Sequence, residues 1–227
     1  MTKKKRARPM LQVALDFEIL DDALVVAKKV APYVDILEAG TPLIKSEGIK
    51  VVQTLKETYS DKLVCADLKT ADAGYLEVKM AAQAKADIIT ILADAYDATI
   101  KEALRAAHDF HVEIMADLIV SRSPAIRLAG LIDLKYKDTR LNYALVHSGL
   151  DRQASRRSPL LELEMVTRLR DHPKLAVAGG IRVLDIPKIL AFPVNIIIVG
   201  GAITRVDNPS ETAKKFQNAI AQFNKQL

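Results

Sequence analysis

The chain has 227 residues, half of them hydrophobic, and a formal net charge of +5. This length suits one (β/α)8 barrel, whose usual size is about 250 residues, and the apolar fraction is enough for a large core. The sequence contains no run of about 18 or more uncharged apolar residues, and no apolar stretch follows the basic start. We therefore expect neither membrane association nor a signal peptide.

The positive charge is concentrated at the start of the chain. Five basic side chains lie within the first eight residues: Lys3, Lys4, Lys5, Arg6 and Arg8. Removing these five from the 33 Lys and Arg leaves 28, which balance the 28 Asp and Glu. We interpret residues 1–9 as a short, disordered, solvated tail and residues 10–227 as a single domain. A basic run can also bind nucleic acid, but the neutral body argues against a nucleic-acid partner.

Cysteine usage indicates a reducing compartment. Cys65 is the only cysteine, so no disulfide can form within the chain, as is usual in the cytoplasm. It lies in the apolar run Leu63–Ala66, where a buried, unreactive thiol is favoured over a nucleophile. We therefore expect a cytoplasmic protein without thiol chemistry.

Short apolar runs, rich in β-branched residues, alternate with segments of helical periodicity. The expected strands are Leu11–Leu15, Val34–Leu37, Leu63–Ala66, Ile88–Leu92, Val112–Ala116, Tyr143–Val146, Leu175–Ala178 and Ile196–Val199. The clearest expected helices are Asp21–Val30, Glu47–Thr58, Tyr75–Ala84, Ala98–His108, Leu160–Arg170 and Ser210–Phe223, with a further helix near Ser123–Gly130. This alternation predicts βαβ units with right-handed crossovers.

About eight such units close into a barrel. An open doubly wound sheet is the alternative, and it more often carries a glycine-rich turn after its first strand. Here Asp16-Phe17-Glu18 follows that strand instead. The predicted fold class is therefore α/β, a (β/α)8 TIM barrel.

Polar residues stand at the ends of five predicted strands: Asp16, Glu38, Asp67, Asp117 and His147. Because the carboxyl ends of barrel strands share one rim, where catalytic groups lie, we expect these side chains to form one site. A lone acidic residue after a strand often caps the next helix, but five such positions are hard to explain as caps.

Glycine pairs follow the last two strands, as Gly179-Gly180 and Gly200-Gly201. Loops at these places frequently bind phosphate through backbone N–H groups and a short helix N-terminus. Glycine lets the backbone approach the anion closely, although a single pair would also suit a tight turn. The two pairs together predict a phosphate site.

The segment Asp67–Asp72 has the highest density of chemically useful residues. Asp67 and Lys69 are two positions apart, so both can point the same way from a strand end. A carboxylate beside an ammonium stays ionised, and such a pair can hold a divalent cation near a proton donor. A surface ion pair is the alternative, which the apolar run before it disfavours. Glu38 on the adjacent strand could give Mg²⁺ a second carboxylate.

His147 is the candidate acid or base near neutral pH. His108, His111 and His172 lie in helix or loop contexts and are interpreted as surface or packing residues. No Cys/His spacing in the sequence indicates zinc, and no Ser-His-Asp arrangement with a nucleophile elbow is found.

These residues resemble the orotidine-monophosphate decarboxylase superfamily, whose hallmark is D-x-K-x-x-D at the end of the third strand. Asp67, Lys69 and Asp72 match that motif. Within this group the chain is similar to the 3-hexulose-6-phosphate synthases and the 3-keto-L-gulonate-6-phosphate decarboxylases from Leu11 to about Phe223. The close matches are residues 11–16, 38–48, 66–74, 147–154, 178–181 and 199–204.

Several positions favour the synthases. Residues 40–44 and the motif around Lys69 have the synthase-like form. The decarboxylases typically carry an arginine, a threonine and an arginine where this chain has Leu150, Ala178 and Gly201. Without both arginines, the site lacks two cations that could pair with the extra carboxylate and the phosphate of the decarboxylase substrate.

Three stretches depart from the family pattern. Ser148 stands where threonine is usual, and Ser155-Arg156-Arg157 replaces a stretch that is usually small and glycine-containing. The segment Leu131–Arg140 is unusually polar for its place. The second departure could alter the loop over the site, and all three bear on substrate identity more than on fold.

The resemblance implies an aldehyde-lyase that condenses formaldehyde with D-ribulose 5-phosphate through an enediolate. It implies Mg²⁺ held by Glu38 and Asp67, with Lys69 adding positive charge and Asp16 orienting Lys69. Mg²⁺ would act as a Lewis acid where the enediolate charge develops.

The same resemblance suggests roles for the remaining residues. His147 is expected to transfer the proton, with Asp117 as the weaker candidate, while Gly180, Gly201 and the adjacent N–H of Ala202 anchor the phosphate. Asp72 typically reaches into a neighbouring subunit's site, which implies a homodimer with shared sites.

Three alternatives remain open from the sequence. The first is the decarboxylase, whose reaction passes through a similar enediolate. The second is another sugar-phosphate epimerase or lyase on the same barrel. The third is a sugar-phosphate-binding regulator without catalysis, against which the intact acid–base set argues.

Overall fold

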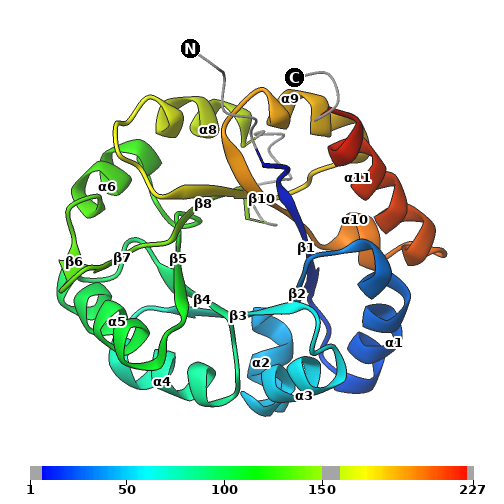
Figure 1. Cartoon of the computed structure of the whole chain (residues 1–227), viewed down its shortest axis with the longest axis horizontal. Coiled ribbons are helices and arrows are strands. Elements are labelled where there is room, and N and C mark those ends of the chain that lie inside the picture. Colours follow the sequence, from blue (N-terminus) through cyan, green and yellow to red (C-terminus); the bar gives the residue numbers. More distant parts are fainter. Residues whose placement is uncertain (1–6, 150–158, 224–227) are drawn as a thin grey trace.

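The computed structural model describes residues 7–149 and 159–223. Eight parallel strands close into a barrel in the order β1-β10-β9-β8-β5-β4-β3-β2, and the helices lie outside it (Figure 1). The barrel strands are β1 Met10–Leu15, β2 Ile36–Ala39, β3 Leu63–Thr70, β4 Ile88–Leu92, β5 Glu113–Asp117, β8 Tyr143–His147, β9 Lys174–Ala178 and β10 Val194–Val199. The predicted (β/α)8 barrel is confirmed, and the open sheet is excluded.

The helices follow the expected alternation. They are α1 Leu20–Val30, η1 Ala31–Tyr33, α2 Thr41–Glu47, α3 Lys50–Thr58, α4 Gly74–Gln83, α5 Asp97–Phe110, α6 Pro124–Leu131, α8 Leu160–Thr167, η2 Val183–Asp185, α9 Ile186–Leu190, α10 Gly201–Thr204 and α11 Pro209–Phe223. The short elements α9, α10 and η2 were not predicted, because so few residues cannot show helical periodicity.

The prediction of one helix over Glu47–Thr58 was wrong. Gly48 has a φ of +80°, outside the helical region, and it separates α2 from α3. Helix α2 begins directly after Gly40, with Pro42 in its first turn, where the missing N–H of proline costs no hydrogen bond. This early start brings Thr41 to the carboxyl end of β2.

The polar segment Leu131–Arg140 forms a small hairpin outside the barrel. Its strands are β6 Lys135–Tyr136 and β7 Thr139–Arg140. Nδ1 of His108 on α5 lies 3.2 Å from Oγ1 of Thr139, and its ring meets Tyr136 edge-on. His108 therefore packs this hairpin onto α5, in line with the packing role expected for it.

The strands are buried on both faces. Ile196 and Ile198 of β10 point into the barrel interior, while Ile197 and Val199 belong to the layer between strands and helices. This explains the continuous apolar runs in the sequence. Cys65 lies in the interior cluster, where burial raises the pKa of its thiol and keeps it unreactive.

Four polar residues join the amino ends of neighbouring strands. The side chains of Asp35, Asp87, Asn142 and Asn195 accept N–H groups of Leu11, Val64, Ile114 and Leu175, respectively, at 2.7–3.0 Å. The four acceptors stand at the start of every second barrel strand, and each donor belongs to the strand before its acceptor. The amino end of such a barrel serves stability, and the opposite end is free for chemistry.

The described part of the predicted tail is attached to this end of the barrel. Two nitrogens of the Arg8 guanidinium donate to the two oxygens of Asp35 at 2.6 and 2.8 Å. Residues 1–6, which contain most of the basic run, lie outside the described residues.

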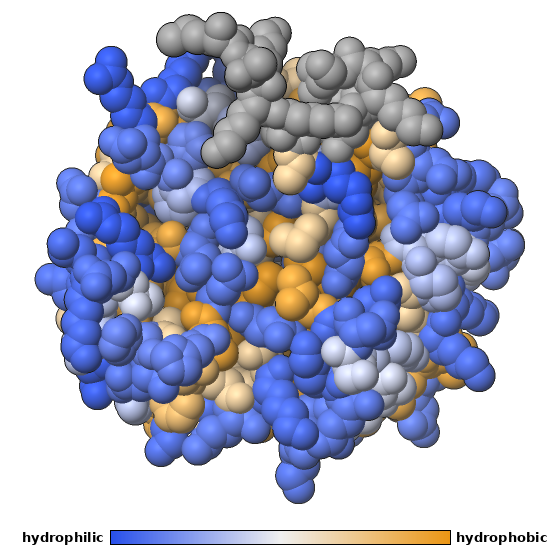
Figure 2. Space-filling view, viewed as in Figure 1, coloured by the Kyte–Doolittle hydropathy of each residue, from blue (hydrophilic) through white to orange (hydrophobic). Residues whose placement is uncertain are grey.

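The surface is mostly hydrophilic on the face that Figure 2 shows, with hydrophobic residues visible in its middle. Within residues 7–149 and 159–223, every helix is too short or too polar to cross a membrane.

Candidate active site

A cavity of about 660 Å³ opens at the carboxyl ends of the strands. A volume of this size suits a small-molecule ligand. Ten predicted site residues line it: Asp16, Glu38, Asp67, Lys69, His147, Gly179, Gly180, Gly200, Gly201 and Ala202. Residues that are far apart in the sequence thus meet at one rim, because eight parallel strands end there.

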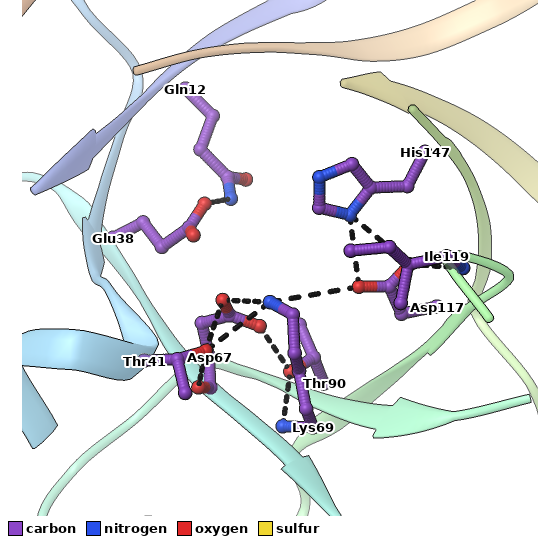
Figure 3. Close-up of polar contacts among 9 residues, drawn as sticks. All are labelled: Gln12, Glu38, Thr41, Asp67, Lys69, Thr90, Asp117, Ile119 and His147. Carbon is purple, nitrogen blue, oxygen red and sulfur yellow. Dashed lines mark hydrogen bonds and ion pairs between the residues drawn. The ribbon is translucent and has the colours of Figure 1, made fainter. Parts of the chain in front are cut away.

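Asp67 is the most heavily bonded carboxylate of the site (Figure 3). Thr90 donates to its Oδ1 at 2.7 Å, and Thr41 donates to its Oδ2 at 2.7 Å. Its Oδ2 also pairs with the ammonium of Lys69. Burial opposes ionisation of Asp67, but Lys69 and these hydrogen bonds outweigh it and lower the pKa of the carboxyl. Asp67 is therefore a fixed anion.

Lys69 is held in an unusual backbone conformation. Its φ is +50°, and the pairing between β3 and β4 shifts register between Ala66 and Thr70. A left-handed conformation costs a residue with a Cβ roughly 1–2 kcal/mol. The shift turns the Lys69 ammonium toward Asp67 and to 3.7 Å from Oδ2 of Asp117. Burial acts against the ammonium, but these carboxylates raise its pKa, so Lys69 stays charged.

Glu38 lies beside this pair but has a different environment. Its side chain is 6% exposed, and Nε2 of the fully buried Gln12 donates to its Oε2. Burial raises the pKa of Glu38 well above its usual value, and the charges of Asp67 and Asp16 raise it further. Oε1 of Gln12 has no hydrogen-bond partner within the described residues. The positive charge near Glu38 is thus too small to offset the effects of burial and of the neighbouring carboxylates on its pKa.

Asp16 follows β1 and faces the cavity. Surrounding protein atoms raise the pKa of its carboxyl by desolvation, and Asp67 adds to the rise, while Lys69 and Arg205 oppose it. The role expected for Asp16 was to orient Lys69. In this structure Asp67 and Thr41 hold Lys69 instead, with Oγ1 of Thr41 lying 3.2 Å from the ammonium.

Asp117 and His147 form a second group on the other side of the site (Figure 3). Asp117 is fully buried, and its Oδ2 lies 3.0 Å from Nδ1 of His147. Its Oδ1 also accepts the backbone N–H of Ile119 at 2.9 Å, which fixes the carboxylate. The second ring nitrogen of His147 points away from Asp117. The pair thus resembles the carboxylate–histidine units that orient a general base.

The two glycine pairs form the remaining wall. Gly179 has a φ of +107°, and a Cβ there would collide with the carbonyl oxygen of Ser148. Gly200 and Gly201 begin the short helix α10, whose first N–H groups have no partner within the helix. Backbone N–H groups are therefore available at this wall, and the phosphate site expected here stays a prediction.

Two predicted residues do not line the cavity. Asp117 lies behind the wall and acts through its contacts with His147 and Lys69. Asp72 is exposed and lies outside the cavity of its own chain. Leu150 and the altered segment Ser155-Arg156-Arg157 lie outside the described residues.

Sequence reasoning missed five polar residues of the site: Gln12, Glu18, Thr41, Thr90 and Arg205. Gln12 and Thr90 are polar residues within otherwise apolar strands, and this pattern was a usable signal. Thr41 and Arg205 stand at the ends of short helices, which contain too few residues for helical periodicity to predict them.

The described side chains offer only a few ligands for a metal ion. No three His, Cys, Asp or Glu side chains within residues 7–149 and 159–223 converge on one point that could hold an ion. Glu38 and Asp67 are two carboxylates on adjacent strands that face the same cavity, so a cation there would take its other ligands from substrate or water.

Comparisons with known proteins identify the family of this chain. The family model described as Orotidine 5'-phosphate decarboxylase / HUMPS family matches residues 9–216. A protein of Staphylococcus haemolyticus (strain JCSC1435) named 3-hexulose-6-phosphate synthase is 40% identical over 210 residues, which cover 92% of this chain and 98% of that protein.

Solved structures give the same result. A crystal structure of 3-hexulose-6-phosphate synthase has a TM-score of 0.85 at 38% identity, covering 92% of this chain and 99% of that one. A crystal structure of 3-keto-L-gulonate-6-phosphate decarboxylase from Vibrio cholerae has a TM-score of 0.83 at 30% identity, covering 96% and 99%. The chain therefore belongs to the Orotidine 5'-phosphate decarboxylase / HUMPS family and is a lyase-type enzyme.

Proposed function

We propose that the chain is a 3-hexulose-6-phosphate synthase, which condenses formaldehyde with D-ribulose 5-phosphate. The observation that carries this proposal is one cavity lined by Lys69 and His147, with the Lys69 ammonium held by Asp67 and Asp117 and the His147 ring held by Asp117. Such a cavity can generate and stabilise a carbanion next to a ketone. The relative named 3-hexulose-6-phosphate synthase, at 40% identity, supports the choice of this reaction.

The reaction requires a proton to leave C1 of the ketose phosphate. The resulting enediolate carries negative charge on the oxygens of C1 and C2. Lys69 keeps its charge near neutral pH, because Asp67 and Asp117 raise its pKa. A fixed ammonium near the developing charge stabilises it without reorganisation.

His147 moves the proton. Asp117 accepts a hydrogen bond from Nδ1, which leaves the lone pair of Nε2 free to take the proton from C1. The enediolate carbon then attacks formaldehyde and forms the new carbon–carbon bond. The imidazolium returns the proton to the oxygen of the former aldehyde, so proton and charge balance over the cycle.

Glu38 and Asp67 fit a divalent cation. Glu38 is buried and faces the negative charges of Asp67 and Asp16, with only the amide of Gln12 as a donor. A dication would offset that repulsion, and two carboxylates with additional oxygen ligands suit Mg²⁺. When bound, Mg²⁺ would supply Lewis-acid stabilisation of the substrate oxygens.

The wall formed by Gly179-Gly180 and Gly200-Gly201 is suited to the phosphate of the substrate. Asp72 is suited to a site that two subunits share. N–H groups at Gly180, Gly201 and Ala202 would bind the phosphate oxygens. Asp72 is exposed and does not line its own cavity, as expected of a residue that completes the site of a second subunit. We propose a homodimer on this basis.

The test compares two reactions with the same preparation. Formaldehyde consumption is measured with D-ribulose 5-phosphate and Mg²⁺, and CO₂ release is measured with 3-keto-L-gulonate 6-phosphate. We expect formaldehyde consumption that EDTA abolishes, with little CO₂, and no activity in Lys69→Met. Dominant CO₂ release would identify the chain as a decarboxylase, a second candidate supported by the likeness to the Vibrio cholerae enzyme. Silence in both assays would refute the proposal.

A further inference from the structure

Arg205 is a cavity residue without a role in the reaction described above. It follows α10 directly and lines the cavity beside Gly201 and Ala202. Within residues 7–149 and 159–223, its guanidinium makes no ion pair or side-chain hydrogen bond. Its charge acts on Asp16 of the same cavity, but no ion pair among the described residues holds the guanidinium, so it is available to a ligand.

The charges of the cavity show why such a cation is needed. Four carboxylates line it: Asp16, Glu18, Glu38 and Asp67. The Lys69 ammonium already forms ion pairs with Asp67 and Asp117, away from the glycine pairs. Among the described lining residues, Arg205 is the other cation. A phosphate dianion that enters this acidic cavity would otherwise meet only backbone N–H groups at the glycine wall.

The backbone of α10 explains how Arg205 reaches that wall. Residues 201 and 205 lie one helical turn apart, and the Arg205 N–H donates to the Gly201 carbonyl at 3.0 Å. A side chain four residues along a helix leans back over the preceding turn. A Cβ built on Gly201 would lie 3.3 Å from Cδ and 3.5 Å from Nε of Arg205. The Arg205 stem therefore occupies the space that any side chain at position 201 would need.

We propose that Arg205 is the phosphate-binding cation of this site, and that glycine at position 201 leaves room for it. The proposal rests on the sugar-phosphate substrate proposed above, and it adds a residue that determines specificity for a phosphorylated over an unphosphorylated sugar. Arginine is suited to this task, because its planar fork can donate two parallel hydrogen bonds to phosphate oxygens.

Arg182 offers a matched control. It lies on the same rim, two residues after Gly180, and its exposed guanidinium pairs with Asp185 at 3.2 Å. It does not line the cavity. Replacing it changes the net charge of the rim by the same amount as replacing Arg205.

The first measurement is the Kd of inorganic phosphate, taken from the rise in Tm during a phosphate titration at constant ionic strength. Wild type, Arg205→Ala, Arg205→Lys and Arg182→Ala are compared. We expect about a 10- to 100-fold weaker Kd in R205A, since one charged hydrogen-bonding partner is lost. R205K should lie between R205A and wild type, and R182A should match wild type.

The second measurement separates binding from chemistry. R205A should raise the KM for D-ribulose 5-phosphate and leave kcat within about threefold of wild type, because the phosphate is bound equally in the ground and transition states. A Kd in R205A within about twofold of wild type would overturn the assignment, as would an equal loss in R182A. Wild type that binds phosphate but lacks synthase activity would refute the proposed function alone, and the four Kd values would still decide the role of Arg205.

Discussion

Nδ1 of His147 lies 3.0 Å from Oδ2 of Asp117, a carboxylate that no solvent reaches. In the proposed reaction, this contact would select the tautomer in which the unprotonated Nε2 faces the cavity, and it would stabilise the imidazolium formed when His147 takes a proton. Asp117 therefore acts through His147, and this makes it a positioning residue in the proposed reaction.

Asp117→Asn should lower kcat about 100-fold or more and change KM little, because the amide keeps the shape but loses the charge. Steady-state kinetics with D-ribulose 5-phosphate would measure this. Asp133→Asn is the control, since Asp133 is fully exposed and does not line the cavity. A kcat close to wild type in D117N would show that His147 needs no carboxylate partner.

Glu38→Gln should stabilise the metal-free protein while it abolishes activity. Glu38 is buried among negative charges, and the neutral amide removes that repulsion. Gln at position 38 can accept from Nε2 of Gln12 and donate to its unpartnered Oε1. The free energy of unfolding in EDTA should rise by about 1–2 kcal/mol, or roughly 2–8 °C in Tm.

The matched control for this variant is Glu57→Gln, which removes an exposed carboxylate paired with Lys85. Its Tm should stay near that of wild type, since exposed pairs contribute little. A lower Tm in E38Q than in wild type would mean that the Glu38 carboxylate is well compensated without a cation.

Magnesium should raise the Tm of wild type and fail to raise that of Glu38→Gln or Asp67→Asn. A ligand that binds only the folded state adds about 2.7 kcal/mol at roughly 100 times its Kd. Differential scanning calorimetry over a Mg²⁺ titration would measure this, with Glu57→Gln as a variant that keeps the response. An unchanged response in both carboxylate variants would place the metal elsewhere.

The sequence predicted those site residues whose positions follow directly from the order of the strands. Buried parallel strands showed themselves as apolar runs, so the strand ends and the closeness of Glu38, Asp67 and Lys69 followed from strand order. The pairing of Asp117 with His147 did not follow, because strand order gives no side-chain direction. Arg205 was missed because it follows a helix too short to have a periodic pattern.

The polar ring at the amino end was missed for a different reason. Asp35, Asp87, Asn142 and Asn195 recur at the start of every second barrel strand. Each looks like an ordinary turn residue when it is considered alone. Their common role becomes visible only when the strands are arranged around the barrel, where each side chain accepts an N–H from the preceding strand.

Asp72 should be required in trans. Mixing Asp72→Asn with His147→Ala, each inactive alone, should restore activity after subunit exchange, since a hybrid dimer contains one complete site. Random exchange would restore about one quarter of the wild-type activity, because half of the dimers are hybrids with one site each. Light scattering would confirm the dimer, and no recovery after verified exchange would place Asp72 in its own subunit's function.

Asp35 should make stability depend on pH. Its carboxylate accepts hydrogen bonds from Arg8 and the Leu11 N–H, and although burial opposes its charge, these partners lower its pKa below the usual 3.8. A lowered pKa in the folded state means that the stabilisation is present above about pH 4 and is lost as pH falls through the folded pKa. Asp35→Ala should cost about 2 kcal/mol near pH 7, because it also leaves the Leu11 N–H unpaired.

Asp35→Asn separates the two contributions to this stability. The amide oxygen can still accept the Leu11 N–H, so D35N should lose less than D35A and should respond less to pH than wild type. Urea unfolding at several pH values would measure the three free energies. Because protonation removes the charge of Asp35 in wild type, the gap between wild type and D35N should close below the folded pKa. A gap that stays constant down to acid pH would show that the Arg8–Asp35 ion pair does not stabilise the amino end of β1.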